Sequence, residues 1–234
     1  MEGRPEVKDV CGEVAANGCP GATDCSLVKE IALLREQCRK LEELSFVDAL
    51  TGLYNFRYMQ KALEMEMERT RRTRLPTGLI MADLDHFKNV NTLYGHECGN
   101  AALRLLGKVL MESVRKIDVP CRYGGEEFAI ILPGSSLRES VKIAERLSDN
   151  IRYNPVVFEN KSLTLTASFG VAVFHSVDQS TAGEFVKRAD ELLYEAKKSG
   201  RNRVCSESYG PEIQPDEVTA EEKMALSSPV ADGK

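Results

Sequence analysis

The amino-acid sequence predicts an α+β fold, in which helices face a sheet. The first indication is the order of patterns between residues 48 and 204, which is helix, strand, helix, hairpin, helix, strand pair, helix, strand. The second is the segment RYGGEEF, where two glycines and two carboxylates lie between short apolar stretches. The third is size, because 234 residues, 42% of them apolar, suit one ordinary domain plus extensions.

The first 25 residues are rich in Gly, Ala, Pro and acidic residues and show no sustained periodicity. Such a segment buries too little apolar surface to order itself, so residues 1–25 are predicted to be disordered. The chain has seven cysteines and no C-x-x-C spacing. The role of the N-terminal cysteines stays open, since their spacings match no zinc or iron–sulfur pattern; they are Cys11, Cys19, Cys25 and Cys38.

Residues 26–45 predict a coiled-coil helix that could carry a signal into the following domain. Apolar residues recur there in alternating steps of four and three over about two heptads, at Leu27, Ile31, Leu34, Cys38 and Leu41. This spacing predicts a parallel homodimer through the N-terminal helix. The alternative is a helix that packs its apolar stripe on its own domain, and the shortness of the seam leaves that alternative open.

The next segment predicts a helix and then a strand that ends in carboxylates. Helical spacing runs from Asn55 to a basic stretch before Pro76. A short apolar strand, Gly78–Ala82, then leads to Asp83 and Asp85. A buried strand fixes the direction of such carboxylates, while the loop after it leaves them accessible.

A polar, turn-rich joint over residues 91–100 and a helix over Ala101–Val114 follow. Two apolar stretches, Val119–Tyr123 and Phe128–Leu132, then predict a hairpin with the acidic pair at its turn. Glycine suits this turn because it accepts positive φ and lets another molecule approach the backbone closely.

The last elements are two helices with strand material between them. The helices are expected over Leu137–Ile151 and Thr181–Ser199, and the strand pattern over Leu163–Phe174. Beyond Cys205 the chain is acidic and low in large apolar residues, so residues 206–234 are predicted to be a disordered acidic tail.

Two acidic loops are expected to lie side by side on the sheet, one with Asp83 and Asp85 and one with Glu126 and Glu127. Mg²⁺ binds through one or two carboxylates and completes its shell with water and substrate phosphates. The loops therefore indicate metal-dependent phosphoryl chemistry. A protease or hydrolase is disfavoured, since no Ser-His-Asp or Cys-His set with a supporting turn is visible.

Charge and hydropathy narrow the class of partner. A formal net charge of -5 argues against a nucleic-acid surface, which normally shows a basic excess. No stretch approaches the roughly 18 consecutive apolar residues of a membrane span, and the N-terminus lacks the basic-then-apolar order of a secretion signal. We therefore expect a cytoplasmic protein without a membrane span that binds a small phosphate compound.

Six ordered blocks resemble the signatures of GGDEF domains, the diguanylate cyclases of bacterial second-messenger signalling; they are DALTGLYN, LDHFKNVN, GHECGNAAL, RYGGEEFAIILP, ASFGVAV and ADELLYEAKKSGRNRV. The resemblance implies a GGDEF catalytic domain at residues 46–205. It also implies a palm-like α+β fold with an antiparallel-centred sheet flanked by helices, related to nucleotidyl cyclases and polymerase palms. The implied reaction condenses two GTP into cyclic di-GMP with release of two pyrophosphates, and it needs two domains facing each other.

The resemblance assigns the chemical centre to three acids. Asp83 and Glu126 match the metal-binding acids, and the backbone carbonyl of Leu84 matches a further metal ligand. Glu127 matches the adjacent acid that supports the metal and the active site. The implied cofactor is Mg²⁺ or Mn²⁺, two ions per active site, and the implied catalytic residues are these three acids.

The resemblance also implies a substrate site. Phe87 and Lys88 match the positions that hold the terminal phosphates, and Asn91 matches a guanine contact. Lys197 and Arg201 resemble a phosphate clamp, and their spacing of four predicts that they share one face of the last helix. The alternative for this pair is a solvated basic helix end.

Asn100 departs from the family pattern, which normally has an aspartate that reads the guanine edge. A carboxylate accepts both guanine N–H groups, whereas an amide accepts one and can instead pair with adenine. A base-relaxed cyclase that also makes cyclic GMP-AMP is therefore an alternative. Phe56 replaces a usual Arg and Thr92 a usual Asp, both away from the metal acids.

An R-x-x-D pair, Arg115 and Asp118, precedes the GGEEF turn where the family carries an inhibitory site for cyclic di-GMP, and Arg146 resembles the second-domain arginine that completes the inhibited state. The resemblance thus implies allosteric product inhibition, and a helix-end ion pair is the alternative. A catalytically silent nucleotide-binding effector and a coiled-coil adaptor remain as further function classes.

Overall fold

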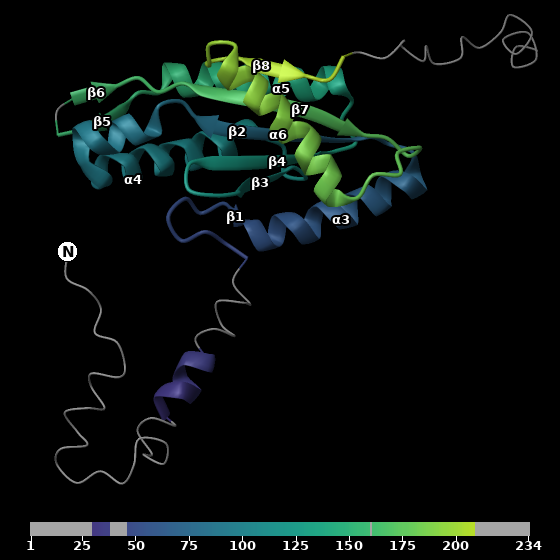
Figure 1. The fold of residues 1–234 in the computed structure, drawn as a ribbon, viewed down its shortest axis with the longest axis horizontal. Helices are drawn as coiled ribbons and strands as arrows, with labels where there is room; N and C mark the ends of the chain where they lie inside the picture. Colours follow the sequence, from purple (N-terminus) through teal and green to yellow (C-terminus); the bar gives the residue numbers. More distant parts are fainter. Residues whose placement is uncertain (1–29, 38–45, 160, 209–234) are drawn as a thin grey trace, which may run out of the picture. The chain divides into compact units, whose positions relative to one another are not determined.

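The computed structural model describes residues 30–37, 46–159 and 161–208 (Figure 1). Residues 30–37 are helical and belong to a unit that ends at Val47, separate from the unit that begins at Asp48. The segment 1–25, the four N-terminal cysteines and residues 209–234 of the expected tail lie outside the described residues. Three cysteines are described, all of them free: Cys98, Cys121 and Cys205.

The second unit contains four helices and eight strands in its described part. The helices are α3 (Phe56–Thr73), α4 (Phe87–Ser113), α5 (Leu137–Tyr153) and α6 (Ala182–Lys198). The strands are β1 (Tyr54–Asn55), β2 (Thr77–Leu84), β3 (Val119–Arg122), β4 (Glu127–Pro133), β5 (Val156–Phe158), β6 (Lys161–Leu163), β7 (Ala167–Phe174) and β8 (Val204–Ser206).

Six of these strands form one sheet in the order β1-β3-β4-β2-β7-β8. Strand β2 lies inside it and pairs antiparallel with β4 on one side and with β7 on the other. The two outermost pairs, β1 with β3 and β7 with β8, are parallel. The predicted antiparallel-centred sheet flanked by helices is thus confirmed.

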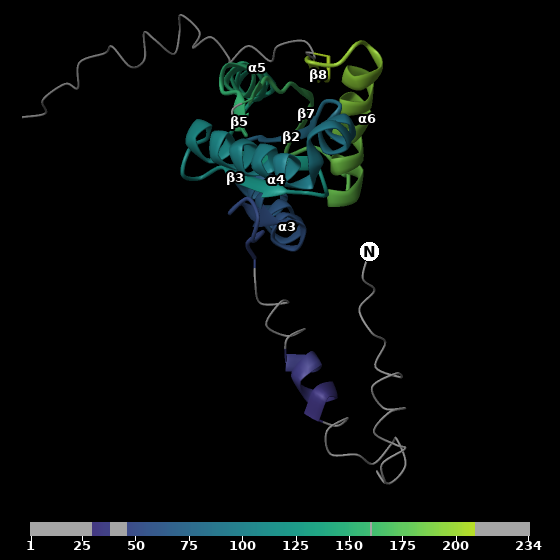
Figure 2. The ribbon, with the colours of Figure 1, turned by 90° about the vertical axis from the view of Figure 1, so that its left-hand side faces the viewer.

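Helices cover both faces of the sheet (Figure 1, Figure 2). Side chains alternate along β2, so that Ile80 and Ala82 pack with α4 and α5, whereas Leu79 and Met81 pack with α3 and α6. Every residue of β2 is buried, as expected for a strand covered on both sides. The strand that carries the first acidic residues is therefore held in the middle of the domain.

Three helix starts follow directly from local sequence. Ser136 and Glu139 form a reciprocal capping box at the start of α5, and Thr181 and Glu184 form another at the start of α6. The Asn55 side chain accepts the backbone N–H of Tyr58 and caps α3. These caps satisfy backbone N–H groups that a helix start otherwise leaves unpaired.

The structure corrects the joint expected over residues 91–100. Helix α4 runs through it, and only Gly95 departs from helical dihedrals, with φ 82° and ψ 165°. Glycine reaches this positive φ at little cost, so the chain can kink there and continue as helix on both sides.

The strand pattern expected over Leu163–Phe174 is also divided differently. Strand β7 begins only at Ala167, and β6 pairs with β5 in a separate hairpin that the sequence interpretation did not include. Each of these two strands has three residues, too few for alternation to be recognised. Strand β8 reaches Ser206, one residue beyond the predicted domain limit.

Candidate active site

The acidic residues meet at one end of two neighbouring strands. Asp83 lies near the end of β2 and pairs in register with Glu127, the first residue of β4. Glu126 is in the turn before β4, and its backbone oxygen accepts the N–H of Leu84 at 3.3 Å. The antiparallel register therefore brings the acids of both segments together, as the sequence predicted for the two loops.

These carboxylates lie in an environment that disfavours their charged forms. Asp83 is 7% exposed, and burial raises its pKa above the ordinary value, while Lys197 acts in the opposite direction. Burial and then the charge of Asp83 raise the pKa of Glu126. The negative charge of Asp83 thus makes Glu126 harder to ionise, and a cation between the two carboxylates would relieve that repulsion.

Two basic residues lie at the same end of the sheet. The Lys197 Nζ is 2.8 Å from Asp83 Oδ2, in an ion pair that is largely shielded from water. The charge of Arg201 lowers the pKa of Asp83 as well, although less than Lys197 does. The predicted phosphate clamp therefore lies beside the predicted metal acids.

The structure corrects the expectation that Lys197 and Arg201 share one helix face. Helix α6 ends at Lys198, Gly200 has φ 113° and Arg201 has φ 60°. Arg201 consequently lies in a left-handed turn after the helix, and the spacing of four does not describe its direction. The glycine at position 200 was the available sequence signal, since glycine commonly follows a helix end.

The GGEEF turn is held by Arg122, which the sequence analysis did not single out. Its guanidinium donates to the Gly125 carbonyl at 2.7 Å and to the Gly124 carbonyl at 3.1 Å. The same guanidinium contacts both oxygens of Asp48 at 3.2 Å. Gly124 is tightly placed too, because a Cβ there would lie 2.7 Å from an oxygen of Glu127. The turn that carries Glu126 is thereby fixed from two sides.

The start of α4 provides backbone donors close to this centre. Phe87 is buried and Lys88 is exposed in the first turn of the helix. His86, at φ 58°, precedes them, and no side chain caps the helix there. Exposed N–H groups at a helix start attract anions, which suits the implied contact of Phe87 and Lys88 with terminal phosphates.

Within α4, the Asn91 side chain lies against Gly99, the residue that precedes Asn100. A Cβ on Gly99 would overlap the side-chain oxygen of Asn91 and would lie 3.1 Å from the Phe87 ring. Both asparagines are partly exposed. The Asn91 side chain therefore packs against the residue that directly precedes Asn100 in the helix.

Asp85 is placed differently from the other acids. It is 6% exposed, and its carboxylate accepts hydrogen bonds from Thr166, Ser168 and the backbone N–H of Asn202. These three donors already engage both oxygens of Asp85, so this carboxylate is held within the fold. The partners of Asp85 are more than eighty positions away in the sequence, and no sequence pattern announces them.

The residues fit a small hard cation, although no group of three or more His, Cys, Asp or Glu side chains gathers within the described ranges. Two carboxylates that repel each other and the nearby backbone carbonyl of Leu84 supply oxygen ligands. Mg²⁺ needs only one or two protein carboxylates when substrate phosphates and water complete its shell. The donor set therefore suits Mg²⁺ or Mn²⁺ bound together with a nucleotide.

The R-x-x-D residues come together at the other end of β3. Asp118 is 5% exposed and accepts the backbone N–H of Arg115 at 2.8 Å, while its Oδ1 has no hydrogen-bond partner in the described part of the chain. Burial raises the pKa of Asp118, and Arg115 and Arg146 act in the opposite direction. Arg146 donates to the carbonyl of Ser113, the last residue of α4, at 2.6 Å. Arg115 and Arg146 of the same chain therefore both lie near enough to Asp118 for their charges to act on it.

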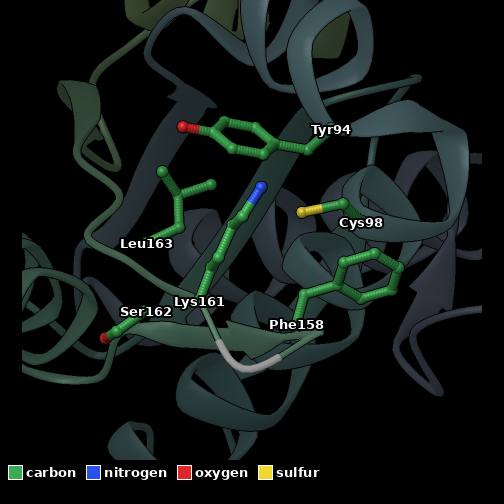
Figure 3. A pocket seen from close by; sticks show the side chains of 6 residues that line it. All are labelled: Tyr94, Cys98, Phe158, Lys161, Ser162 and Leu163. Carbon is green, nitrogen blue, oxygen red and sulfur yellow. The ribbon is translucent and has the colours of Figure 1, made fainter.

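A cavity of about 320 Å³ lies elsewhere, between α4 and the β5–β6 hairpin (Figure 3). The Lys161 ammonium points toward the face of the Tyr94 ring, 5.8 Å from its centroid, and the Cys98 thiol faces the same space. None of the residues that the sequence predicted for substrate or metal lines this cavity. Separately, no helix in the described ranges is long and apolar enough to cross a membrane.

The chain is similar in sequence to known diguanylate cyclases and to a response regulator. This chain is 40% identical over 174 residues to the response regulator PleD of Caulobacter vibrioides, and the aligned region covers 71% of this chain and 37% of PleD. It is 37% identical over 161 residues to the diguanylate cyclase DgcP of Pseudomonas aeruginosa, covering 68% of this chain and 24% of DgcP. The chain thus spans less than half the length of these curated relatives.

Solved structures have the same fold. The diguanylate cyclase SiaD of Pseudomonas aeruginosa, solved with its activator SiaC, matches with a TM-score of 0.67 and 32% identity over 86% of this chain and 73% of SiaD. The active GGEEF domain of a Vibrio cholerae diguanylate cyclase matches with a TM-score of 0.61 and 29% identity over 67% of this chain and 98% of that domain. Residues 45–203 match the family described as "Diguanylate cyclase, GGDEF domain", and the chain belongs to that family.

Proposed function

We propose that this chain is a diguanylate cyclase, which condenses two GTP molecules into cyclic di-GMP and releases two pyrophosphates. The observation that carries the proposal is the meeting of Asp83 and Glu126 with Lys197 and Arg201 at one end of the sheet. Two repelling carboxylates suit a divalent cation, and two adjacent basic side chains suit phosphates. The family membership supports the same reaction.

Asp83, Glu126 and the Leu84 carbonyl are the expected ligands of Mg²⁺ or Mn²⁺, with two ions per active site. When bound, the ions would neutralise charge on the phosphates and favour in-line attack by the 3′-hydroxyl of the partner nucleotide. Glu127 supports the acid pair from the adjacent position. No step needs a side-chain nucleophile, since phosphoryl transfer depends mainly on positioning and charge stabilisation.

The basic residues act on the triphosphate. Lys197 is paired with Asp83 at 2.8 Å. When GTP binds, we expect the Lys197 ammonium to leave this carboxylate and to bind a phosphate oxygen. Arg201 can bind phosphate oxygens with two parallel hydrogen bonds. The N–H groups at the start of α4, beside Phe87 and Lys88, complete the binding of the terminal phosphates.

The reaction requires two domains, because each is expected to hold one nucleotide. We propose that a homodimer forms through the N-terminal helix. Of the expected seam, Ile31 and Leu34 fall in the described helix, and Leu34 is 52% exposed. An apolar side chain left in water at a seam position supports pairing with a second copy.

We further propose that cyclic di-GMP inhibits the enzyme through Arg115, Asp118 and Arg146. The buried Asp118 Oδ1, which lacks a partner in the described structure, supports this, because buried acceptors are normally satisfied and a guanine N–H could bond to it. Arg115 is exposed and can stack on a base or bind a phosphate. GTP as the substrate also supports the expectation of a cytoplasmic location, without nucleic acid as a partner.

The experiment that tests the proposal is incubation of the purified full chain with GTP and Mg²⁺, followed by assay of pyrophosphate and of the dinucleotide product. Wild type should release pyrophosphate in equal amount to the GTP consumed, and Glu126→Gln should release almost none. A silent nucleotide-binding effector would bind GTP without releasing pyrophosphate. A coiled-coil adaptor would do neither, and either result would overturn the proposal.

A further inference from the structure

Asp85 connects the strand that carries the metal acids to two other parts of the fold. It follows β2 directly, two residues after Asp83. Its Oδ1 accepts the hydroxyl of Ser168 at 2.7 Å, and its Oδ2 accepts the hydroxyl of Thr166 at 2.8 Å. The same Oδ2 accepts the backbone N–H of Asn202 at 2.9 Å. One buried carboxylate therefore joins the end of β2, the start of β7 and the turn after α6.

The turn after α6 has an unusual backbone. Gly200, Arg201 and Asn202 follow one another with φ values of 113°, 60° and 47°. The left-handed region is unfavourable for residues that carry a Cβ, so the surrounding structure must hold the turn in place. Two contacts come from its own neighbourhood, one from Arg201 N–H to the Ala196 carbonyl at 3.0 Å and one from Arg203 Nε to the Arg201 carbonyl at 3.2 Å.

The contact between Asp85 and Asn202 is of another kind, since it spans 117 positions of the chain. A hydrogen bond to a buried carboxylate is stronger than a neutral one, and a backbone N–H without its acceptor would be left unpaired. This bond fixes the turn to the strand on which Asp83 lies. It therefore fixes the position of the Arg201 backbone, from which the side chain extends, relative to Asp83.

We propose that Asp85 is a positioning residue for the reaction, which holds the Arg201 turn at a fixed place relative to Asp83 so that Arg201 meets the terminal phosphates. This inference rests on the proposed function, in which Arg201 binds phosphate. It differs from the assignment that sequence alone suggests, in which Asp85 belongs to the acidic pair that would bind metal. A metal ligand needs the negative charge of Asp85, whereas a positioning residue needs only its hydrogen bonds.

The pair of variants Asp85→Asn and Asp85→Ala separates them. An asparagine oxygen can still accept from Thr166 and Asn202, and its NH₂ can donate to the Ser168 hydroxyl, so the asparagine variant keeps the geometry without the charge. Alanine loses both. We expect Asp85→Ala to raise KM for GTP by about tenfold or more, the usual effect of a lost charge-assisted hydrogen bond. Asp85→Asn should stay within about threefold of wild type, and the Mg²⁺ concentration for half-maximal activity should change in neither.

A double-mutant cycle tests whether Asp85 acts through Arg201. In an Arg201→Ala background, Asp85→Ala should add less than about twofold to KM, because the turn then has no side chain to position. Full additivity of the two changes would overturn the proposal. An Asp85→Asn variant as defective as Asp85→Ala, with a raised Mg²⁺ requirement, would also overturn it and would make Asp85 a metal ligand.

Amide hydrogen exchange gives a readout that does not depend on catalysis. The Asn202 amide should exchange slowly in wild type and in Asp85→Asn, and at least about tenfold faster in Asp85→Ala. If wild type releases no pyrophosphate, the proposed function fails, while the exchange rates still test the positioning. Should Asp85→Ala not fold, Thr166→Val replaces it, since it removes one donor to Oδ2; unchanged Asn202 exchange and unchanged KM in that variant would contradict the proposal.

Discussion

Arg122 and Asp48 form an ion pair that links the first residue of the second unit to the turn carrying Glu126. Both carboxylate oxygens of Asp48 lie 3.2 Å from one guanidinium nitrogen, and the other nitrogens bind the carbonyls of Gly124 and Gly125. Asp48 also accepts the N–H and the hydroxyl of Thr51. The shape of the GGEEF turn therefore depends on a residue 74 positions earlier in the chain.

Arg122→Lys is expected to lower activity by about tenfold and to lower the melting temperature by a few degrees. Lysine keeps the charge but cannot bind the carboxylate and the turn carbonyls at once. Steady-state kinetics and thermal unfolding measure the two effects. Arg152→Lys is a matched control, because its pair with Asp149 is exposed and such pairs contribute little. An equal loss in both variants would show that the Arg122 contacts have no special role.

The Mg²⁺ requirement is expected to rise steeply as the solution becomes acidic. The pKa values of Asp83 and Glu126 are raised, so both carboxylates take up protons at a higher pH than free carboxylates do. A protonated carboxyl is a poor ligand, so the half-saturating Mg²⁺ concentration should begin to increase at a pH above the range in which free carboxylates take up protons, and should increase further as the pH falls through that range. Chelation should abolish activity, and added Mg²⁺ should restore it.

The same two carboxyls should raise the free energy of unfolding of the metal-free protein as the pH falls, although Mg²⁺ binding becomes weaker over the same change. A carboxyl whose pKa is higher in the folded state binds more protons there than in the unfolded state, so its contribution to stability grows as the pH falls through the folded pKa. Thermal unfolding without metal, compared for wild type and Asp83→Asn, measures this contribution. A wild-type requirement for Mg²⁺ that is constant across the range would contradict the assignment of these ligands.

Disruption of the seam should weaken activity in a concentration-dependent way. Ile31→Glu with Leu34→Glu should lower specific activity about tenfold or more at low protein concentration, and less at high concentration, because charges in a seam oppose pairing. Leu33→Glu is the control, since Leu33 is similarly exposed on the same helix but lies off the seam. Specific activity that is independent of dilution in all three proteins would exclude a role for the helix in dimerisation.

Arg115→Ala should relieve inhibition by cyclic di-GMP and leave the initial rate nearly unchanged. The guanidinium supplies the phosphate or base contact at this site, at a distance from the metal acids. The neighbouring exposed cation gives a control, Lys116→Ala, which should remain inhibited. Initial rates measured with and without added cyclic di-GMP decide the matter, and a wild-type enzyme that the dinucleotide never slows has no functional inhibitory site.

Asn100→Asp should increase selectivity for GTP over ATP by roughly tenfold to a hundredfold. The amide leaves one guanine donor without an acceptor, which costs about 1–3 kcal/mol, unless water bridges the gap. Equimolar GTP and ATP should give wild type some cyclic GMP-AMP beside cyclic di-GMP, and the variant mainly cyclic di-GMP. Identical products from both proteins would show that Asn100 does not set base choice.

Local sequence signals were sufficient where a residue and its structural role lie close together in the chain. The hairpin around the GGEEF turn and the strand before Asp83 were predicted because turn glycines and apolar runs act over a few residues. The direction of Arg201 was predicted wrongly because a helical spacing was extended past Gly200, where the backbone turns left-handed.

Contacts between distant segments were beyond sequence reasoning. The pairs Asp48–Arg122 and Asp85–Asn202 form only because the sheet brings these segments together. Nothing in the spacing of Thr166 and Ser168 distinguishes hydroxyls that bind a buried carboxylate from hydroxyls in water. The helical course of α4 through the polar joint was missed for a related reason, because packing against the sheet overrides weak local propensity.

The two outermost strands of the sheet are short, two residues in β1 and three in β8. An outer strand with few free N–H and carbonyl groups offers little backbone for another chain to pair with, which protects a protein from growing into extended β-aggregates. Two copies of this domain would therefore not be expected to join by continuing the sheet. They would instead have to meet through helices and loops, which leaves the acidic end of the sheet free to face a second nucleotide.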